Sequence, residues 1–258
     1  GCLTPQIQEA TGLGALPVVA VAGHDTASAV IAVPSPDHDF AYVSCGTWSL
    51  LGTETDGPVI TDLSRRYNFT NEGGAEGTVR LLKNICGLWI FERCREEFRD
   101  APADVAALAA LCRNSECRSL INPDDPAFAN PASMTQAIAE YCRNTGQEVP
   151  ATTADYVQVI FRSLAARYRE VLGWLKEVSD ADIRRLHIIG GGSQNPYLMQ
   201  YAADETGIPV VAGPAECTAL GNVLLQLRAA GMLPGLQQMR DVAVNSTETK
   251  TYLPRINK

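Results

Sequence analysis

Short apolar runs of strand length alternate along the chain with longer segments that repeat apolar residues every three or four positions. A run of four to eight apolar residues favours a buried strand, and the longer period favours an amphipathic helix. The alternation of the two predicts an α/β fold. No repeat and no obvious linker divides the sequence, so we expect one domain over residues 1–258.

The first hundred residues carry most of the strand-like runs. Strands are expected at residues 17–22, 40–45, 48–53, 68–70 and 78–82. Gly46 and Thr47 separate two of these runs and predict a two-residue hairpin turn. An Ala-rich helix is expected over 26–32, with Asp25 as its N-cap, and an amphipathic helix from about 84 to 98.

The middle of the chain is predicted to be helical, and the last part returns to alternating strands and helices. Helices are expected at 103–112, 131–144, 152–178, 196–205 and 218–230, and strands at 186–189 and 209–212. The strand at 186–189 runs directly into a glycine-rich turn, Gly190-Gly191-Gly192-Ser193-Gln194-Asn195.

That turn is a candidate nucleotide-binding segment. Glycines before a helix bring bare backbone N–H groups and the positive helix end close to an anion or a flat ring. The sequence fits neither G-x-G-x-x-G nor a Walker loop, and a tight strand-to-helix connection alone could also require the glycines. The turn by itself therefore leaves both explanations open.

Two further segments could carry chemistry. The hydroxyl of Thr47 and the exposed N–H groups of its turn could hold phosphoryl oxygens without a lysine. A carboxylate at Asp25 is stabilised as an anion by the helix dipole, which suits a base that accepts the proton of an attacking hydroxyl. An ordinary turn and a plain N-cap are the structural alternatives, and His24 is expected to pack or to contact a ligand.

Composition narrows the possible partners. Lys and Arg number 21 against 29 Asp and Glu, so the net charge is −8 with a pI near 4.9. Such a surface repels nucleic acid and anionic lipid. The longest apolar run, 16–22, is far shorter than the roughly 20 residues of a membrane span, and no signal segment opens the sequence. We expect a cytoplasmic protein that binds neither nucleic acid nor membrane.

The eight cysteines and three histidines do not form a metal-binding pattern. No C-x-x-C pair occurs, and no histidine stands at zinc spacing from a cysteine. Cys112 and Cys117 are close enough in sequence to approach each other, but a cytosolic protein is expected to keep them reduced. No metal site built from these side chains is predicted.

The order of these segments resembles the C-terminal half of the FGGY carbohydrate kinases, which belong to the actin-like ATPase superfamily. The resemblance extends over about residues 16–233 and lies in five segments, at 23–30 (GHDTASAV), 44–50 (SCGTWSL), 70–77 (TNEGGAEG), 82–89 (LKNICGLW) and 190–195 (GGGSQN). It implies an actin-like, ribonuclease H-like α/β domain with a mixed β-sheet and flanking helices.

The resemblance also implies a missing partner. The family folds as two domains, and its N-terminal domain carries an Asp-x-Gly-Thr loop for metal and phosphate that this sequence lacks. We therefore expect the chain to be the C-terminal domain of an FGGY-type sugar kinase, with the N-terminal kinase domain outside it. An unusually apolar surface is expected where the two domains meet.

The implied reaction is transfer of the ATP γ-phosphoryl group to the 1-hydroxyl of L-rhamnulose, with Mg²⁺. By position in the motifs, Asp25 would be the catalytic base, and it would contact the sugar together with His24, Thr26 and Asn84. The implied nucleotide contacts are Thr47, Gly191, Asn195 and Glu92, where Glu92 replaces a Gln of related kinases.

Other functions fit the same residues. A non-catalytic actin-like module could hold ATP through the same loops to control an assembly, and the acceptor could be another ketose. A secreted, disulfide-linked binding protein is a third alternative, weakened by the absence of a signal segment. Sugar-dependent release of ADP would separate a sugar kinase from the nucleotide-binding module, and a count of free thiols would test the secreted protein.

Overall fold

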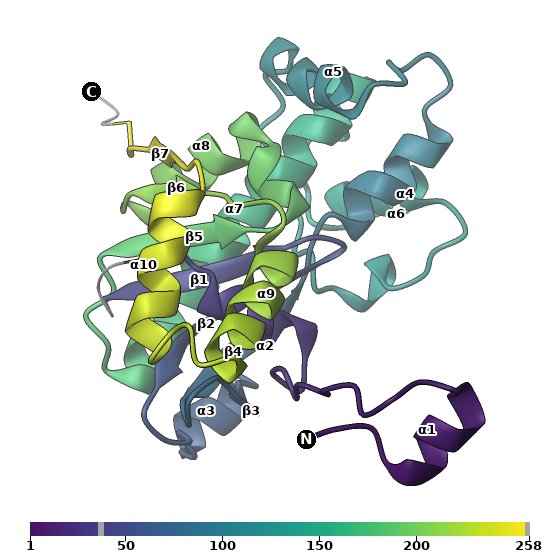
Figure 1. The fold of residues 1–258 in the computed structure, drawn as a ribbon. Helices are drawn as coiled ribbons and strands as arrows, with labels where there is room; N and C mark the ends of the chain where they lie inside the picture. The colour runs from purple at the N-terminus through teal and green to yellow at the C-terminus, as the bar shows by residue number, and fades with distance from the viewer. Residues whose placement is uncertain (36–38, 256–258) are drawn as a thin grey trace.

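The computed structural model describes residues 1–35 and 39–255 and shows a mixed β-sheet with helices on both faces (Figure 1). In the described residues the strands lie in the order β3-β4-β2-β1-β5-β6-β7. Strands β1, β5 and β6 are parallel, and the other neighbouring pairs are antiparallel. The strand bounds are Phe40–Cys45 (β1), Trp48–Thr55 (β2), Thr70–Gly73 (β3), Val79–Cys86 (β4), Arg185–Ile189 (β5), Val210–Ala212 (β6) and Lys250–Tyr252 (β7).

Helices follow the strands in the alternating order that the hydrophobic pattern predicts. Their bounds are Pro5–Thr11 (α1), Asp25–Ile31 (α2), Asp62–Arg66 (α3), Trp89–Glu97 (α4), Val105–Ala110 (α5), Met134–Asn144 (α6), Thr153–Ser179 (α7), Pro196–Thr206 (α8), Cys217–Ala229 (α9) and Leu236–Ser246 (α10). Short 3-10 helices lie at Leu111–Asn114 (η1), Pro126–Phe128 (η2) and Gly191–Gln194 (η3). The expected α/β architecture with a mixed sheet and flanking helices is confirmed.

Strand β1 separates two hydrophobic cores. Its Val43 and Cys45 side chains face the larger core, which α4, α6, α7 and α8 cover. Its Phe40 and Tyr42 side chains face the smaller core under α2, α9 and α10. Alternate residues of a strand point to opposite faces, so this one strand belongs to both layers.

Helices α2 and α9 approach each other closely in the smaller core. A Cβ atom at Gly221 of α9 would lie 1.8 Å from the carbonyl oxygen of Ser28 in α2. Any side chain at this position would therefore push the helices apart. This contact fixes α2, and with it the Asp25 end, against the rest of the domain.

Three sequence-based expectations near the N-terminal half of the chain are wrong. Residues 17–22 form no strand, because they lie on an N-terminal arm, residues 1–24, that has no neighbouring strand among the described residues. Pro17 makes one isolated bridge to Cys2, and Val18 is 50% exposed. The helix expected from about 84 begins only at Trp89, because β4 continues to Cys86.

The third correction concerns the start of α2. His24 is the N-cap, and Asp25 is the first helical residue. The sequence analysis also missed α1, α3, α10 and β7, which are short or lie beyond the last strong pattern.

Two findings on the described residues concern membrane-spanning helices and disulfide bonds. None of the described helices is long and apolar enough to cross a membrane. All eight cysteines are free thiols, and seven of them are buried.

Candidate active site

The hairpin turn between β1 and β2 is exposed and firmly anchored. The expected connection lies here, but it is longer than two residues: the last β1–β2 pair is Cys45 with Ser49, so residues 46–48 form the turn, and the Gly46 N–H donates to the Trp48 carbonyl at 2.8 Å. The N–H groups of Gly87 and Trp89 donate to the Thr47 carbonyl, each at 3.1 Å, and the Leu88 N–H donates to the Gly46 carbonyl at 2.9 Å. Backbone N–H groups at the start of α4 thus donate hydrogen bonds to the carbonyl groups of the turn. The Thr47 hydroxyl makes no hydrogen bond to any described residue.

The glycine-rich turn after β5 shows why its three glycines differ. A Cβ atom at Gly192 would lie 2.3 Å from the Cys45 sulfur, and Gly190 has φ 84° and packs on the Cys45 carbonyl. Burial raises the pKa of the Cys45 thiol, which packs here as a neutral group. Gly191 is exposed, with nothing within 4 Å of an added Cβ. Packing against Cys45 therefore explains why glycine is needed at positions 190 and 192. Gly191 has no such constraint and faces open space.

That open space is a cavity of about 410 Å³ between α4, α5, η3 and the start of α8. Three of the expected nucleotide contacts, Glu92, Gly191 and Asn195, line it together. Most of its remaining lining is apolar, from Leu88, Phe91, Val105, Ala106, Ala109, Pro196 and Tyr197. Apolar walls with a few polar groups are typical of a small-molecule site.

Two polar side chains of this cavity, which we call the nucleotide cavity after the contacts expected to line it, already have local partners. The Asn195 side-chain oxygen accepts from the N–H groups of Tyr197 and Leu198 at 3.1 and 3.2 Å and so caps α8. Its amide nitrogen makes no hydrogen bond to a residue that the structure describes. Glu92 forms an ion pair with Arg95 at 2.7 Å on the surface of α4. A ligand would therefore meet an amide donor and a carboxylate that is already paired.

The N-terminus of α2 carries the other expected residues. The Thr26 N–H donates to His24 Nδ1 at 3.1 Å and to Asp25 Oδ1 at 2.6 Å. The two side chains are 56% and 74% exposed, and His24 Nδ1 lies 2.9 Å from Asp25 Oδ1. The Thr26 N–H therefore holds Oδ1 in place, and the exposed Asp25 Oδ2 is open to an incoming hydroxyl.

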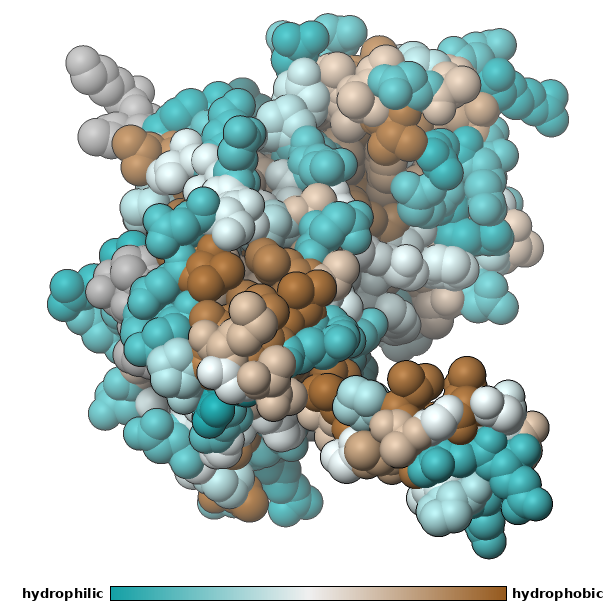
Figure 2. Space-filling model, in the orientation of Figure 1, coloured by the Kyte–Doolittle hydropathy of each residue, from teal (hydrophilic) through white to brown (hydrophobic). Residues whose placement is uncertain are grey.

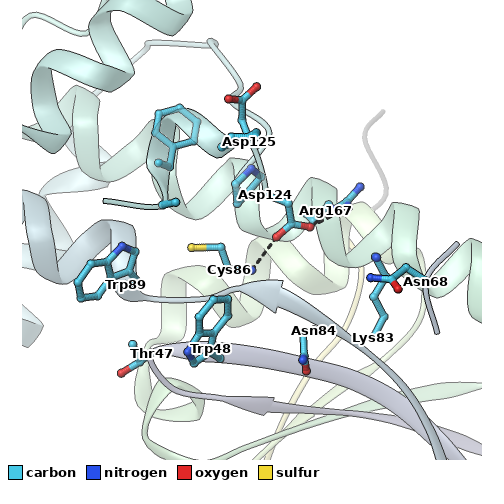
Figure 3. A pocket seen from close by; sticks show the side chains of 14 residues that line it. Thr47, Trp48, Asn68, Lys83, Asn84, Cys86, Trp89, Asp124, Asp125 and Arg167 are labelled. Carbon is cyan, nitrogen blue, oxygen red and sulfur yellow. Dashed lines mark hydrogen bonds and ion pairs between the residues drawn. The ribbon is translucent and has the colours of Figure 1, made fainter. Parts of the chain in front are cut away.

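A second cavity, of about 510 Å³, is lined in part by Thr47 and Trp48 of the hairpin (Figure 3). We call it the Trp48 pocket. Thr47 and Asn84, expected as phosphate and sugar contacts, both line it. The sequence analysis did not single out its other lining residues, Trp48, Asn68, Lys83, Cys86, Trp89, Asp124, Asp125, Phe128 and Arg167 among them.

The structure thus gathers the expected residues into three groups. Glu92, Gly191 and Asn195 share the nucleotide cavity, while Thr47 and Asn84 share the Trp48 pocket. Neighbouring residues at the start of α4 line the two cavities, Leu88 the nucleotide cavity and Trp89 the Trp48 pocket. His24, Asp25 and Thr26 form the third group at the start of α2, and the described lining of these two cavities does not include them.

Comparison with known proteins shows the family to which the chain belongs. The chain belongs to the FGGY family of carbohydrate kinases, whose C-terminal domain model matches residues 41–230. Over 99% of its length it is 56% identical to the rhamnulokinase of Bacteroides thetaiotaomicron, and it covers 52% of that protein. It is 49% identical to the rhamnulokinase of Pectobacterium carotovorum, with 92% of this chain and 48% of that protein covered. The chain spans about half the length of the curated relatives it matches.

Solved structures support the fold. Gluconate kinase from Lactobacillus acidophilus aligns with a TM-score of 0.69 at 14% identity, covering 98% of this chain and 50% of that one. Plasmodium falciparum glycerol kinase with ADP aligns with a TM-score of 0.64 at 14% identity, covering 90% and 46%. At these identities the likeness concerns the fold alone, and it confirms the expected actin-like architecture.

Proposed function

We propose that this chain is the C-terminal half of an ATP-dependent kinase that phosphorylates L-rhamnulose at its 1-hydroxyl. The observation that carries the proposal is the 56% identity to a rhamnulokinase over 99% of this chain. In this proposal the enzyme acts in the cytoplasm, where ATP is available.

The nucleotide cavity supplies the site for ATP. Its apolar walls suit the adenine ring, and the free Asn195 amide and the open backbone at Gly191 suit the ribose end. The cavity adjoins the hairpin turn, because the Leu88 N–H that closes onto Gly46 belongs to a residue of the cavity wall. The triphosphate would then extend toward the Thr47 hydroxyl. In phosphoryl transfer, positioning of this kind supplies most of the catalysis.

Asp25 supplies the base. The sugar's 1-hydroxyl would give its proton to Asp25 Oδ2 as the oxygen attacks the γ-phosphorus, while His24, Thr26 and Asn84 contact the sugar. Thr26 holds the other carboxylate oxygen through its N–H, which orients the base. Asp25 suits this role because its side chain is exposed and its Oδ2 atom makes no hydrogen bond to a described residue.

Mg²⁺ belongs to the proposal as the ion that accompanies ATP. Among the described residues, no group of three His, Cys, Asp or Glu side chains could hold a metal. The side chains of residues 1–35 and 39–255 therefore do not fit a metal site, and we assign no step of the reaction to a metal bound by them.

The remaining half of the kinase would dock against apolar surface on this chain. Figure 2 shows a hydrophobic patch over α9, and Val223 and Met232 are exposed there. The N-terminal arm also exposes Leu16 and Val18. We infer that the N-terminal kinase domain covers part of this surface and closes the active site from the other side.

The test is a coupled ADP assay on the full-length protein with ATP, Mg²⁺ and a panel of ketoses and aldoses. L-rhamnulose should be the preferred acceptor, and ADP release should depend on it. Preference for another ketose would change the assigned substrate. ATP hydrolysis without any acceptor dependence would instead identify a nucleotide-binding module and overturn the kinase proposal.

A further inference from the structure

Three buried side chains form a small polar cluster beneath the hairpin turn, which we call the Tyr168 cluster. The Tyr168 hydroxyl of α7 lies 2.7 Å from the Ser49 hydroxyl and 3.6 Å from the Cys45 sulfur. The Ser49 hydroxyl donates to the same sulfur at 3.8 Å. None of the three residues is more than 1% exposed, and burial raises the pKa of Tyr168 and of Cys45, so the cluster is uncharged.

The Tyr168 cluster holds both ends of the hairpin turn. Cys45 and Ser49 are the last paired residues of β1 and β2, so the turn at 46–48 begins and ends on the cluster. Thr47, the proposed phosphate contact, lies at the centre of this turn. A buried hydroxyl without a partner is unfavourable, so the pairing with Tyr168 keeps Ser49 and the end of the turn in one arrangement.

The glycine-rich turn after β5 rests on the same cluster. A Cβ atom at Gly192 would lie 2.3 Å from the Cys45 sulfur, and one at Gly190 would lie 2.9 Å from the Cys45 carbonyl oxygen. Gly191, the proposed nucleoside contact, stands between these two glycines. The two turns that are proposed to hold opposite ends of ATP therefore both contact Cys45.

The residue before Tyr168 in α7 reaches the hairpin by a second route. Arg167 pairs with Asp124 at 2.7 Å, and Asp124 accepts the Cys86 N–H at 2.7 Å, the contact drawn as a dashed line in Figure 3. Residues 87–89 follow directly and donate their N–H groups to the carbonyls of Gly46 and Thr47. Helix α7 thus supports the turn both at its base and through its carbonyl groups.

We propose that Tyr168 is a positioning residue of the kinase: its hydroxyl sets the spacing between the hairpin turn, which holds the phosphates, and the glycine-rich turn, which holds the nucleoside. The inference rests on the proposed function and deepens it. Tyr168 is fully buried and is not among the described residues that line the two cavities, so it acts through Ser49 and Cys45. Phosphoryl transfer depends on such spacing, because a small displacement of the reacting groups costs rate.

The first experiment compares two ligands on the full-length protein without sugar. ADP would contact both turns, whereas adenosine would contact only the glycine-rich turn. Tyr168→Phe removes the hydroxyl and keeps the ring, so it should weaken ADP binding about fivefold, roughly the contribution of one hydrogen bond, and leave the affinity for adenosine unchanged. Equilibrium titrations with ADP and with adenosine measure this difference, and a role in folding alone would not produce it.

Steady-state kinetics provide the second experiment. Tyr168→Phe should lower kcat about tenfold and leave the KM for L-rhamnulose unchanged, because the phosphates are displaced and the sugar is not. Ser49→Ala removes the other side of the same contact and should have a similar effect. The double variant should then be no slower than the slower single variant.

Tyr201→Phe is the matched control. It removes a hydrogen bond of similar length, 2.6 Å from the Tyr201 hydroxyl to Gln158 of α7, which involves neither turn. This variant should lose stability but keep kcat and both affinities. Thermal unfolding of each variant measures the loss of stability and checks that the protein is folded.

The proposal is overturned if Tyr168→Phe keeps the wild-type kcat, if its affinities for ADP and adenosine fall by the same factor, or if the two single effects multiply in the double variant. Absence of sugar-dependent ADP release from the wild type would overturn the kinase proposal instead. The comparison of ADP with adenosine needs no sugar, so it would still decide whether Tyr168 sets the spacing of the two turns.

Discussion

The glycine-rich turn after β5 and the start of α2 would serve the two substrates of one reaction, yet they are built in opposite ways. The turn packs on Cys45 of β1, and two of its glycines are required by that packing. Asp25 and His24 are exposed and follow directly on an arm whose helix α1 has no buried residue. In Figure 1 this arm extends away from the sheet. We therefore expect the proposed nucleotide side to be complete within this chain and the proposed sugar side to depend on the other half of the kinase.

The strongest test of this difference is the chain by itself. With only one wall of the active site, it should bind ADP weakly and show no detectable phosphorylation of L-rhamnulose, because domain closure is needed to orient both substrates. Calorimetric titration with ADP and a coupled ADP assay measure the two properties. Turnover near that of an intact sugar kinase would show that the sugar side is complete after all.

Asp25→Asn in the full-length protein should have the next largest effect. Loss of a positioned general base should lower kcat by about a hundredfold or more, with little change in the affinity for ATP. Steady-state kinetics with L-rhamnulose provide the measurement. Asp182→Asn removes another exposed carboxylate and is the control. Near-normal kcat in Asp25→Asn would remove Asp25 from the mechanism.

Two neighbouring glycines test how the nucleotide side is built. Gly192→Ala places a Cβ atom 2.3 Å from the Cys45 sulfur and should lower the free energy of unfolding by about 2 to 3 kcal/mol. Gly191→Ala meets nothing within 4 Å, so it should keep the stability and weaken only ADP binding. Denaturant unfolding and ADP titration of both variants separate the two roles. Equal stability of the two would contradict the packing argument.

The smallest expected effect is a dependence of the free energy of unfolding on pH, caused by His187 in β5. Burial lowers the pKa of His187 to about 3, and neither ring nitrogen has a hydrogen-bond partner among the described residues. Below its ordinary pKa of 6.5 the unfolded chain binds a proton that the folded chain does not, so stability falls as the pH decreases toward 3. Between pH 7 and 5.5 the loss should be about 1 kcal/mol.

His187→Leu is the matched variant for this pH effect. Its unfolding free energy should change less than that of the wild type over the same pH interval, as measured by urea unfolding at each pH. An unchanged pH slope in the variant would mean that other groups cause the loss.

Local patterns predicted the parts of the site that lie within one short segment. The turn at Gly46-Thr47 and the glycine-rich turn are each specified by a few adjacent residues between two apolar runs, and both lie where they were expected, although the register makes the first turn three residues long. The strand expected at 17–22 is wrong because apolar residues alone do not show whether a neighbouring strand exists to pair with them. The length of β4 was underestimated because its last residues, Asn84 to Cys86, also fit a helical period.

The Trp48 pocket was not predictable for a different reason. Its walls come from the hairpin, the end of β4, the 123–129 loop and Arg167 of α7, segments that only the tertiary fold brings together. The single local sign was Trp48, a large aromatic residue directly after an exposed turn. Sequence alone could not show that Lys83 would be buried against Trp174 without a direct ion pair to a described residue.

The hydrogen bonds between the hairpin turn and the start of α4 also matter for engineering. Residues 46–48 and 87–89 are forty positions apart in sequence, but three backbone bonds join them into one unit. A hairpin exchanged with that of another sugar kinase would lose its anchor unless residues 87–89 were exchanged with it. The two segments should be transplanted together when the nucleotide or acceptor preference of such an enzyme is redesigned.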